Sequence, residues 1–486
     1  MSSTFDVINP ATEKLVISLQ EADVAQTDEI IAKAAKAYLT WKKVSPGDRA
    51  NLLRRFSAIV TAHREELAQL EITNSGHTRG NALWEADNVA NVLNYYAGAP
   101  ERLFGKQIPV AGGVDITFKE PIGVVGIIVP WNFPMPIASW GFAAALAAGN
   151  TVVLKPAELT PMTAVRLAEL ALVAGIPEGV LNVIVGKGSV VGARFVTNPI
   201  VRKISFTGST RTAKIVAAQC ATTMTPVVLE CGGKDPVIVA ADANLERAVD
   251  ATIWSAMANA GQSCIGAERV YVDERVADKF VELAVKLAKT IHAGAPGDGN
   301  YGPATMPSQI KVIQSHIKTA IKDGGSCAYG GPESVKPPFV QPVILLDVPE
   351  DSAAMREETF GPTIIINRVK TMREAVELSN ASSYGLGANV WSKRQGKRIA
   401  SELACGMVAI NSTFSFAAVA SVPFGGVKDS GYGRVHGPEG LLEYTYARTV
   451  VRTRFNVPLN LLSFKRKSKE ENLVITLTRW LKGRFG

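Results

Sequence analysis

The stretch that decides the fold runs from residue 121 to residue 155 and reads PIGVVGIIVPWNFPMPIASWGFAAALAAGNTVVLK. Two short β-branched runs, VVGIIV and TVVLK, flank an Ala-rich segment of helical character. Neither run alternates apolar with polar residues, so we expect both to be strands that are buried on each face. The pattern continues through LNVIVG, KISFTG, VVLE and PVIVA. Buried strands separated by helices predict parallel β-α-β units, and therefore an α/β fold.

A second alternating series begins near residue 268 with ERVYVD and continues through PVILLD, PTIIINRV, GANVWS and GMVAIN. It predicts a second α/β domain, since 486 residues exceed what one hydrophobic core usually holds. From residue 27 to about residue 70 the apolar residues recur at helical spacing and predict amphipathic surface helices. Residues 99 to 118 contain Pro, a Gly pair and strand-like flanks, which predict a protruding hairpin.

Charge and cysteine content narrow the class of protein. The formal net charge is +8, but residues 452–486 carry nine Lys or Arg against two Glu, which leaves +1 for the rest of the chain. This balance argues against a nucleic-acid partner, because the basic character belongs to the tail alone. The five cysteines are scattered without a C-x-x-C pair, and the first residues show no signal-peptide pattern. We therefore expect a reducing, cytoplasmic setting.

Cys264 is the first candidate for chemistry. It lies in NAGQSCIGAER, residues 259–269, a polar, Gly-containing loop that follows an Ala-rich helical stretch. An unselected cysteine is more often a buried apolar side chain, but such a cysteine usually stands inside an apolar run. A thiol in a polar loop can instead serve as a nucleophile.

Glu230 and Asn132 each follow a predicted buried strand. Glu230 ends VVLE directly before a Gly pair, where burial would raise its pKa towards that of a general base. The alternative is an ordinary solvated glutamate at a strand end. Asn132 lies between two prolines in VPWNFPMP, and its amide can either face a developing oxyanion or close a turn.

Two further strand ends suit a dinucleotide. Gly208 and Ser209 in ISFTGSTRTAK stand between a strand and a helical stretch, where free backbone N–H groups favour a pyrophosphate, although the motif is not G-x-G-x-x-G. Lys155 and Glu158 follow TVVLK and suit either ribose hydroxyls or a surface ion pair. The five His form no metal-spacing cluster, and neither G-x-S-x-G nor a Walker loop occurs, so no metal site and no serine hydrolysis are expected.

Nine motifs, in order, resemble the NAD(P)-dependent aldehyde dehydrogenase superfamily over about residues 7 to 450. They are PWNFP, KPAELTP, SFTGST, LECGGKDP, NAGQSCIGAERV, EETFGP, YGLGANV, GMVAIN and PFGGVKDSGYGR. The resemblance implies that Cys264 is the nucleophile, that Glu230 is the general base, and that Asn132 with the Cys264 N–H forms an oxyanion hole. The implied cofactor contacts are Trp131, Lys155, Glu158, Gly208, Ser209, Glu358 and Phe360.

The same resemblance implies the reaction. An aldehyde is oxidised to the acid through a Cys264 thiohemiacetal and thioester, and water activated by Glu230 hydrolyses the thioester. Members that pass the acyl group to coenzyme A typically lack this glutamate. The cofactor is expected to be NAD rather than NADP, because the Glu158 carboxylate would accept the 2′-hydroxyl of NAD and repel a 2′-phosphate.

The expected substrate is an apolar aliphatic or aromatic aldehyde. Trp140 stands where the similar succinate-semialdehyde enzymes carry an arginine, and an indole cannot bind a carboxylate as a guanidinium does. Trp140, Ile137, Phe424 and Tyr96 are therefore predicted to line an apolar pocket. Three alternatives remain open: a semialdehyde dehydrogenase, a coenzyme-A-acylating enzyme, and a catalytically silent, membrane-attached scaffold.

The resemblance also implies an organisation into four parts. These are a Rossmann-like NAD-binding domain (1–98 and 119–230), an α/β catalytic domain (231–432), a bridging β element (99–118 and 445–455), and a basic extension (456–486). The bridging element implies a homodimer or homotetramer through strand addition. In the extension, residues 468–486 predict an amphipathic helix that docks on protein, which we favour, or lies on an anionic membrane. Co-sedimentation with liposomes separates the two.

Overall fold

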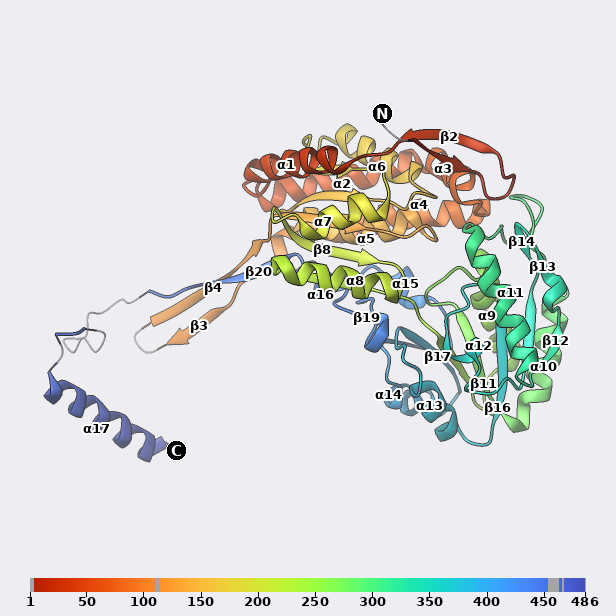
Figure 1. Ribbon diagram of the computed structural model, residues 1–486. Helices are drawn as coiled ribbons and strands as arrows, with labels where there is room; N and C mark the ends of the chain where they lie inside the picture. The colour runs from red at the N-terminus through yellow and green to blue at the C-terminus, as the bar shows by residue number, and fades with distance from the viewer. Residues whose placement is uncertain (1–3, 111–112, 453–462, 466, 486) are drawn as a thin grey trace. The chain divides into compact units, whose positions relative to one another are not determined.

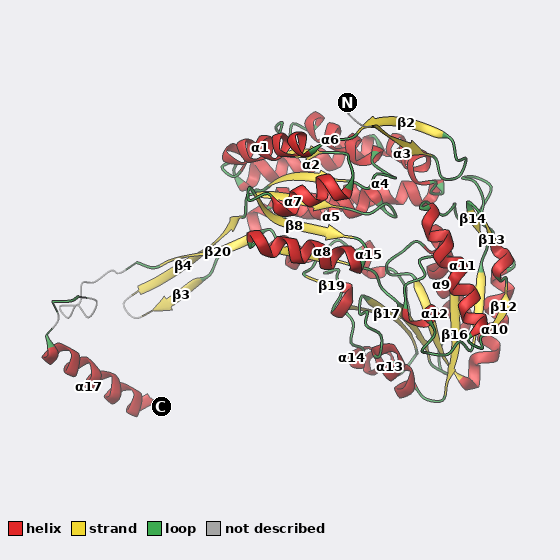
Figure 2. Ribbon diagram, viewed as in Figure 1, coloured by secondary structure: helices red, strands yellow, loops and turns green. Residues whose placement is uncertain are grey.

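The computed structural model describes residues 4–110, 113–452, 463–465 and 467–485 (Figure 1). The chain divides into two compact units. The main unit comprises the residues up to Leu103 together with Pro121–Tyr446, and the second unit comprises Phe104–Glu120 together with the residues from Ala447 onward. The α/β fold expected from the sequence is confirmed, and the two sheets of the main unit carry it (Figure 2).

A six-stranded sheet forms the first half of the main unit, with the strand order β19-β9-β8-β5-β6-β7. Its strands are β5 (Val124–Ile128), β6 (Thr151–Lys155), β7 (Leu181–Val183), β8 (Val201–Thr207), β9 (Val227–Glu230) and β19 (Gly431–Tyr432). Neighbouring strands run parallel except β19, which is antiparallel to β9. The strand order reverses between the neighbours β5 and β8. In such sheets, ligands bind in the crevice at the carboxyl ends of the strands beside this reversal.

Helices cover this sheet. They are α1 (Val24–Trp41), α2 (Pro46–Ala62), α3 (Arg64–Ser75), α4 (Arg79–Ala97), α5 (Pro134–Ala147), α6 (Met162–Val173), α7 (Ala193–Thr197), α8 (Thr210–Cys220) and α16 (Gly437–Leu442). All 14 residues of α5 are buried, since this Ala-rich helix packs against β5 and β6 and also against α2 and α4. An N-terminal hairpin of β1 (Thr4–Ile8) and β2 (Leu15–Gln20) was not expected from the sequence.

A seven-stranded sheet forms the second half, with the order β12-β15-β16-β11-β10-β17-β18. Its strands are β10 (Asp235–Val239), β11 (Ala267–Asp273), β12 (Ser326–Tyr329), β15 (Val343–Leu346), β16 (Thr363–Val369), β17 (Gly387–Trp391) and β18 (Met407–Ile410). Only β12 is antiparallel to its neighbour. The accompanying elements are α9 (Leu245–Met257), α10 (Glu274–Ala288), α11 (Pro307–Lys322), α12 (Ala353–Arg356), α13 (Met372–Asn380), α14 (Gly396–Glu402), α15 (Ser415–Ala418) and the hairpin of β13 (Val335–Lys336) and β14 (Phe339–Val340).

The two sheets meet end to end. Residues 231–234 join β9 directly to β10, so the carboxyl edge of the first sheet lies beside the amino edge of the second. Because parallel strands bring like ends to one edge, the residues after β5, β6, β8 and β9 gather near the residues before β10, β11 and β16. Every candidate catalytic and cofactor residue named from the sequence lies in one of these segments or, for Lys155 and Glu230, at the last position of the strand before it.

The second unit contains a three-stranded sheet of β3 (Gln107–Val110), β4 (Gly113–Pro121) and β20 (Thr445–Val450) in the order β20-β4-β3. The predicted hairpin is present as the antiparallel pair β3 and β4. A helix, α17, extends over Ser468–Phe485, and its Leu473, Leu477 and Trp480 are exposed. Within the described residues no helix is both long and apolar enough to cross a membrane.

Several sequence-based expectations are not tested by these elements. Residues 456–462 of the predicted extension, and the side chains of α17 after Trp480, lie outside the described residues. The predicted four-part domain organisation stays a prediction. So do the homodimer or homotetramer, the cytoplasmic location, and the docking of α17 on protein or membrane.

Candidate active site

The loop that carries Cys264 is held in an unusual backbone conformation. It follows α9, and both Asn259 (φ 53°) and Ala260 (φ 56°) adopt the left-handed region that non-glycine residues rarely occupy. Gln262 stabilises the loop, because its Nε2 donates to the Asn259 and Pro303 carbonyls at 2.9 and 3.2 Å. Its Oε1 accepts the N–H of Thr305 at 2.8 Å. The hydrogen bonds of Gln262 therefore fix the turn that carries the Cys264 thiol just before β11.

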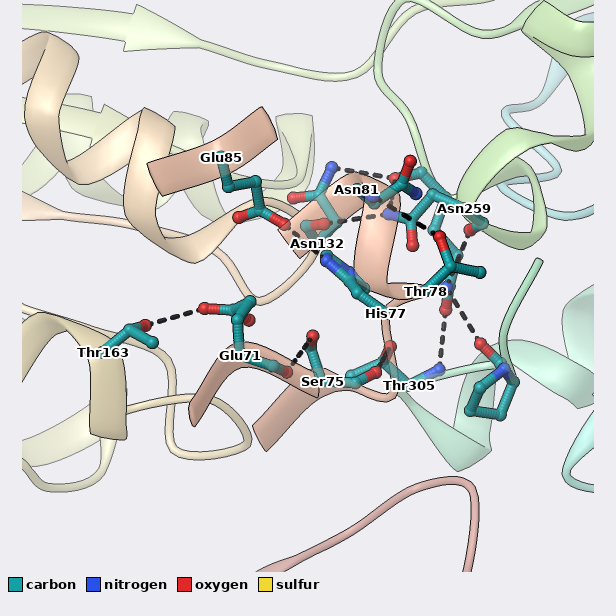
Figure 3. A network of polar contacts seen from close by, with 12 residues as sticks. Glu71, Ser75, His77, Thr78, Asn81, Glu85, Asn132, Thr163, Asn259 and Thr305 are labelled. Atoms are coloured by element: carbon teal, nitrogen blue, oxygen red, sulfur yellow. Dashed lines mark hydrogen bonds and ion pairs between the residues drawn. The ribbon is translucent and has the colours of Figure 1, made fainter. Parts of the chain in front are cut away.

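Asn132 is bonded directly to this loop. It lies between β5 and α5, is 3% exposed, and donates from Nδ2 to the Gln262 carbonyl at 3.0 Å. In return, Asn259 Nδ2 donates to the Asn132 carbonyl at 2.9 Å (Figure 3). These two bonds bring together the ends of strands from the two sheets. Asn259 and Gln262 were not singled out from the sequence, although both are amide residues within the quoted NAGQSC segment.

The surroundings of Cys264 oppose its ionisation. The side chain is half-buried, and burial raises the pKa of its thiol well above the usual range. The carboxyl groups of Glu358, Asp235 and Glu230 add to this rise, because a negative neighbour disfavours a thiolate. The thiol of the free protein is therefore protonated at neutral pH and needs a proton acceptor or a nearby positive charge to become a nucleophile.

Glu230 stands at the end of β9 with no hydrogen bond to either carboxyl oxygen among the described residues. It is 3% exposed, and burial raises its pKa well above the usual range, while the positive charge of Arg434 opposes the rise. The approach of Gly425 is close, since a Cβ there would lie 2.6 Å from Glu230 Oε1. A carboxyl group with a raised pKa and unused oxygens has the chemistry of a general base once it is deprotonated.

Four candidate cofactor residues lie at the ends of β6 and β8. Lys155 is buried, with Nζ 3.5 Å from Glu158 Oε1, and burial lowers the pKa of this lysine. Glu158 Oε1 accepts the backbone N–H of Gly188 at 2.6 Å, which fixes the carboxylate's direction. Ser209 is exposed and caps α8, while Gly208 beside it has room only for a hydrogen, because a Cβ would meet the Phe206 ring at 2.7 Å.

The remaining cofactor candidates come from the amino edge of the second sheet and from the turn after β5. Glu358 Oε1 accepts the N–H of Gly233 at 3.1 Å, and burial raises the pKa of Glu358 to about 8. The ring of Phe360 meets that of Trp131 edge to face at 5.6 Å between centroids. Glu268, which the sequence did not single out, accepts the Phe360 N–H at 3.2 Å and so supports the left-handed backbone there.

A cavity of about 400 Å³ opens at Cys264. Three of the four predicted pocket residues line it, namely Ile137, Trp140 and Phe424. The prediction for Tyr96 is wrong, because this side chain is fully buried on the inner face of α4 and its hydroxyl donates to the Gly437 carbonyl at 3.2 Å. Six aromatic side chains line the cavity: Trp84, Phe133, Trp140, Trp254, Phe414 and Phe424.

Comparisons with known proteins agree with this fold. The model of the aldehyde dehydrogenase family matches residues 1–450. Cytosolic 10-formyltetrahydrofolate dehydrogenase of Xenopus tropicalis is 37% identical over 463 residues, which cover 92% of this chain and 51% of the relative. Mitochondrial succinate-semialdehyde dehydrogenase of Arabidopsis thaliana is 36% identical over 450 residues, covering 91% and 85%. The NAD+ complex of an aldehyde dehydrogenase from Bacillus cereus matches with a TM-score of 0.90 and 36% identity, covering 92% and 93%.

The fold and these matches define the class of protein, an α/β chain like the aldehyde dehydrogenases, whose matching solved structures include an NAD+ complex from Bacillus cereus and an NADP dependent enzyme from E. coli. The chain belongs to the aldehyde dehydrogenase family. It spans about half the length of the 10-formyltetrahydrofolate dehydrogenases that it matches, and most of the length of the succinate-semialdehyde dehydrogenase.

Replacing Glu358 with Gln is expected to lower the pKa of the Cys264 thiol, because it removes a carboxyl group that opposes formation of the thiolate. Inactivation by iodoacetamide, followed as a function of pH, measures this pKa. Glu357→Gln is the matched control, since the Glu357 side chain is 71% exposed. An unchanged pH profile in Glu358→Gln would show that this carboxyl group does not act on the thiol.

Proposed function

We propose that the chain oxidises an apolar aldehyde to its carboxylic acid with NAD, through a covalent intermediate on Cys264. The observation that carries the proposal is the hydrogen-bonded junction of Asn132 with the Cys264 loop, whose Asn259 and Cys264 line an aromatic cavity. It supports a nucleophile, an amide donor and a substrate space within one site. Glu230 supplies a buried carboxyl group with unused oxygens close enough to influence the pKa of the thiol.

In the first half of the reaction, the Cys264 thiol gives its proton to water, the resulting thiolate attacks the carbonyl carbon, and the carbonyl oxygen becomes an alkoxide. The Asn132 amide and the backbone N–H of Cys264 donate to that oxygen. A single donor of this kind stabilises the transition state by about 2.7 to 4 kcal/mol, so each donor raises the rate roughly 100- to 1,000-fold. Bound NAD would supply the acceptor for the hydride of the former aldehyde carbon, and the acyl group would remain on Cys264 as a thioester.

In the second half, water attacks the thioester carbon while Glu230 takes its proton. The C–S bond breaks, the carboxylic acid leaves, and Cys264 is restored. Burial suits Glu230 to this step, because a raised pKa makes its carboxylate a stronger base than an exposed one. Transfer of the acyl group to coenzyme A would not need such a base, and the proposal therefore favours hydrolysis.

The variants Cys264→Ala and Glu230→Gln separate the two halves. Cys264→Ala is expected to form no NADH from benzaldehyde, because no thioester can form. Glu230→Gln is expected to release one equivalent of NADH in a burst and then stall at the thioester. Absorbance at 340 nm in a stopped-flow instrument records both phases.

Cys405→Ala is the matched control, because Cys405 is also a half-buried free cysteine but is absent from the residues that line the cavity. It should turn over as the wild type does. Steady turnover in Glu230→Gln would contradict the assigned base, and NADH formation by Cys264→Ala would contradict the nucleophile.

NAD is proposed over NADP on the basis of Glu158. Its carboxylate is held by the Gly188 N–H beside Lys155, in a direction suited to a ribose hydroxyl. A 2′-phosphate placed there would be repelled by the negative charge. We expect a higher kcat/KM for NAD than for NADP, and a smaller ratio in Glu158→Gln than in the exposed control Glu169→Gln. A wild-type preference for NADP would refute the assignment.

An uncharged aldehyde is proposed as substrate because no charged side chain is among those that line the cavity in the described part of the chain. Trp140 cannot pair with an anion there, since its indole N–H already donates to Asn88 Oδ1 at 3.0 Å. Burying the free carboxylate of a semialdehyde without a partner would be costly. The same reasoning disfavours the activity named for the Arabidopsis relative.

We therefore expect hexanal and benzaldehyde to have higher kcat/KM than succinate semialdehyde, by tenfold or more if the unpaired carboxylate costs about 1.4 kcal/mol. Initial rates of NADH formation at matched NAD concentration measure these constants. Betaine aldehyde is the control for charge of the opposite sign. Preference for succinate semialdehyde would contradict the proposed substrate class.

A further inference from the structure

The corner between α3 and α4 carries a buried cluster of acid and imidazole side chains that the proposed reaction does not use (Figure 3). Glu71, His77 and Glu85 are each at most 2% exposed. They offer three ligand-type atoms within 4.8 Å of one another. Glu71 accepts the hydroxyl of Thr163 at 2.8 Å, while His77 Nδ1 lies 2.5 Å from Glu85 Oε1. Imidazole and carboxylate groups at such distances are also typical metal ligands, so a metal site is the first alternative to test.

The spacing favours a shared hydrogen over a metal ion. Around a tetrahedral zinc ion, with bonds of about 2.0 to 2.2 Å, two ligand atoms stand roughly 3.4 Å apart. The His77 and Glu85 atoms are much closer than that. Burial lowers the pKa of His77 and raises that of Glu85 well above its usual range, which favours a neutral pair. In such a neutral pair the Glu85 O–H donates a hydrogen bond to Nδ1 of the imidazole.

This pair packs against the turn that contains Asn132. Burial lowers the pKa of His77, and the Glu71 carboxyl group and then the backbone of Asn132 oppose that effect; burial raises the pKa of Glu85, and the backbone of Met135 opposes it. The His77 ring also packs on the Phe133 ring, with centroids 5.8 Å apart. Phe133, the residue that precedes α5, makes no side-chain capping bond of its own. The turn therefore depends on groups from the α3–α4 corner.

Hydrogen bonds through Thr305 also link the α3–α4 corner to the loop that carries Cys264. The Ser75 carbonyl accepts the hydroxyl of Thr305 at 2.8 Å, and the Thr305 N–H donates to Gln262 Oε1 at 2.8 Å. Gln262 is the residue whose carbonyl accepts the Asn132 amide. One corner of the helical layer thus packs on the turn that carries Asn132 and is linked through Thr305 to the loop that carries Cys264.

We propose that the hydrogen-bonded pair of His77 and Glu85 is a positioning device that holds the Asn132 amide in place for the oxyanion. The inference rests on the proposed role of Asn132. Neither His77 nor Glu85 is among the described residues that line the cavity; His77 packs on one lining residue, Phe133, and the pair acts through the turn. Their loss should lower the rate of hydride transfer and leave KM nearly unchanged, because an oxyanion donor acts mainly on the transition state.

Three variants at the pair test its chemistry. Glu85→Leu removes the donor, and we expect kcat for hydride transfer to fall tenfold or more, up to the roughly 100- to 1,000-fold loss caused by removing an oxyanion donor outright. Glu85→Gln keeps a neutral hydrogen-bond donor towards His77 Nδ1, so its kcat for hydride transfer should stay within about twofold of the wild-type value. His77→Phe keeps an aromatic ring packed on Phe133 but removes the Nδ1 acceptor. It replaces Glu85→Leu as the test if that variant does not fold. The surface pair of His63 and Glu66 is of the same residue types at 2.6 Å, so Glu66→Leu is the matched control.

A double-mutant cycle with Asn132→Ala separates positioning from general support of the fold. In the wild-type background we expect Glu85→Leu to lower kcat for hydride transfer. In the Asn132→Ala background the same substitution should lower kcat by less than twofold, because the amide that Glu85 helps to position is already absent. Equal losses in both backgrounds, or a folded Glu85→Leu with full activity, would overturn the proposal. Stoichiometric divalent metal in the purified protein that is lost in Glu85→Gln would also overturn it. Full activity of Asn132→Ala would instead refute the proposed oxyanion hole itself.

Discussion

The pair of hydrogen bonds between Asn132 and the loop 259–262 is the constraint on which the site depends. Asn132 follows β5 of one sheet, and the loop precedes β11 of the other. An oxyanion donor and a nucleophile are useful only if their separation is fixed to a fraction of an ångström. Reciprocal bonds between the two segments provide this, because neither segment can move without breaking the other's hydrogen bond.

Burial around this junction determines the chemistry of the ionisable groups. Cys264, Glu230 and Glu358 all have raised pKa values, and burial is the largest cause in each case. A free protein in this state holds its protons and reacts slowly with electrophiles. The same low-polarity surroundings strengthen each hydrogen bond to an alkoxide once substrate is bound. Protection of the resting thiol and stabilisation of the transition state thus have one physical origin.

Most of the fold could be predicted from the sequence because buried strands and Ala-rich helices leave strong patterns. All eleven quoted strand runs contain a strand, although that in LNVIVG covers only Leu181–Val183, and the hairpin after residue 99 is present. Tyr96 was wrongly predicted to line the pocket because the sequence does not show which side of α4 faces the cavity. The hairpin of β1 and β2 was missed because its residues are mostly exposed and leave no buried pattern.

The candidate catalytic residues could be named because each belongs to a motif, but their geometry could not. No local pattern shows that Asn132 and Gln262, 130 residues apart, are bonded. The cluster of Glu71, His77 and Glu85 was missed for the same reason, since its members lie on two helices and the corner between them, without a metal-type spacing. Such sites become visible only after packing removes water and leaves polar atoms facing one another.

The central claim is that Cys264 carries the acyl group, and trapping that intermediate tests it most directly. Glu230→Gln would be mixed with benzaldehyde and NAD, quenched in acid, digested and mapped by mass spectrometry. The account predicts a benzoyl adduct on the peptide containing Cys264, formed in step with the burst of NADH. An adduct on Cys231 or another cysteine, or a full burst of NADH with no acylated peptide, would contradict it.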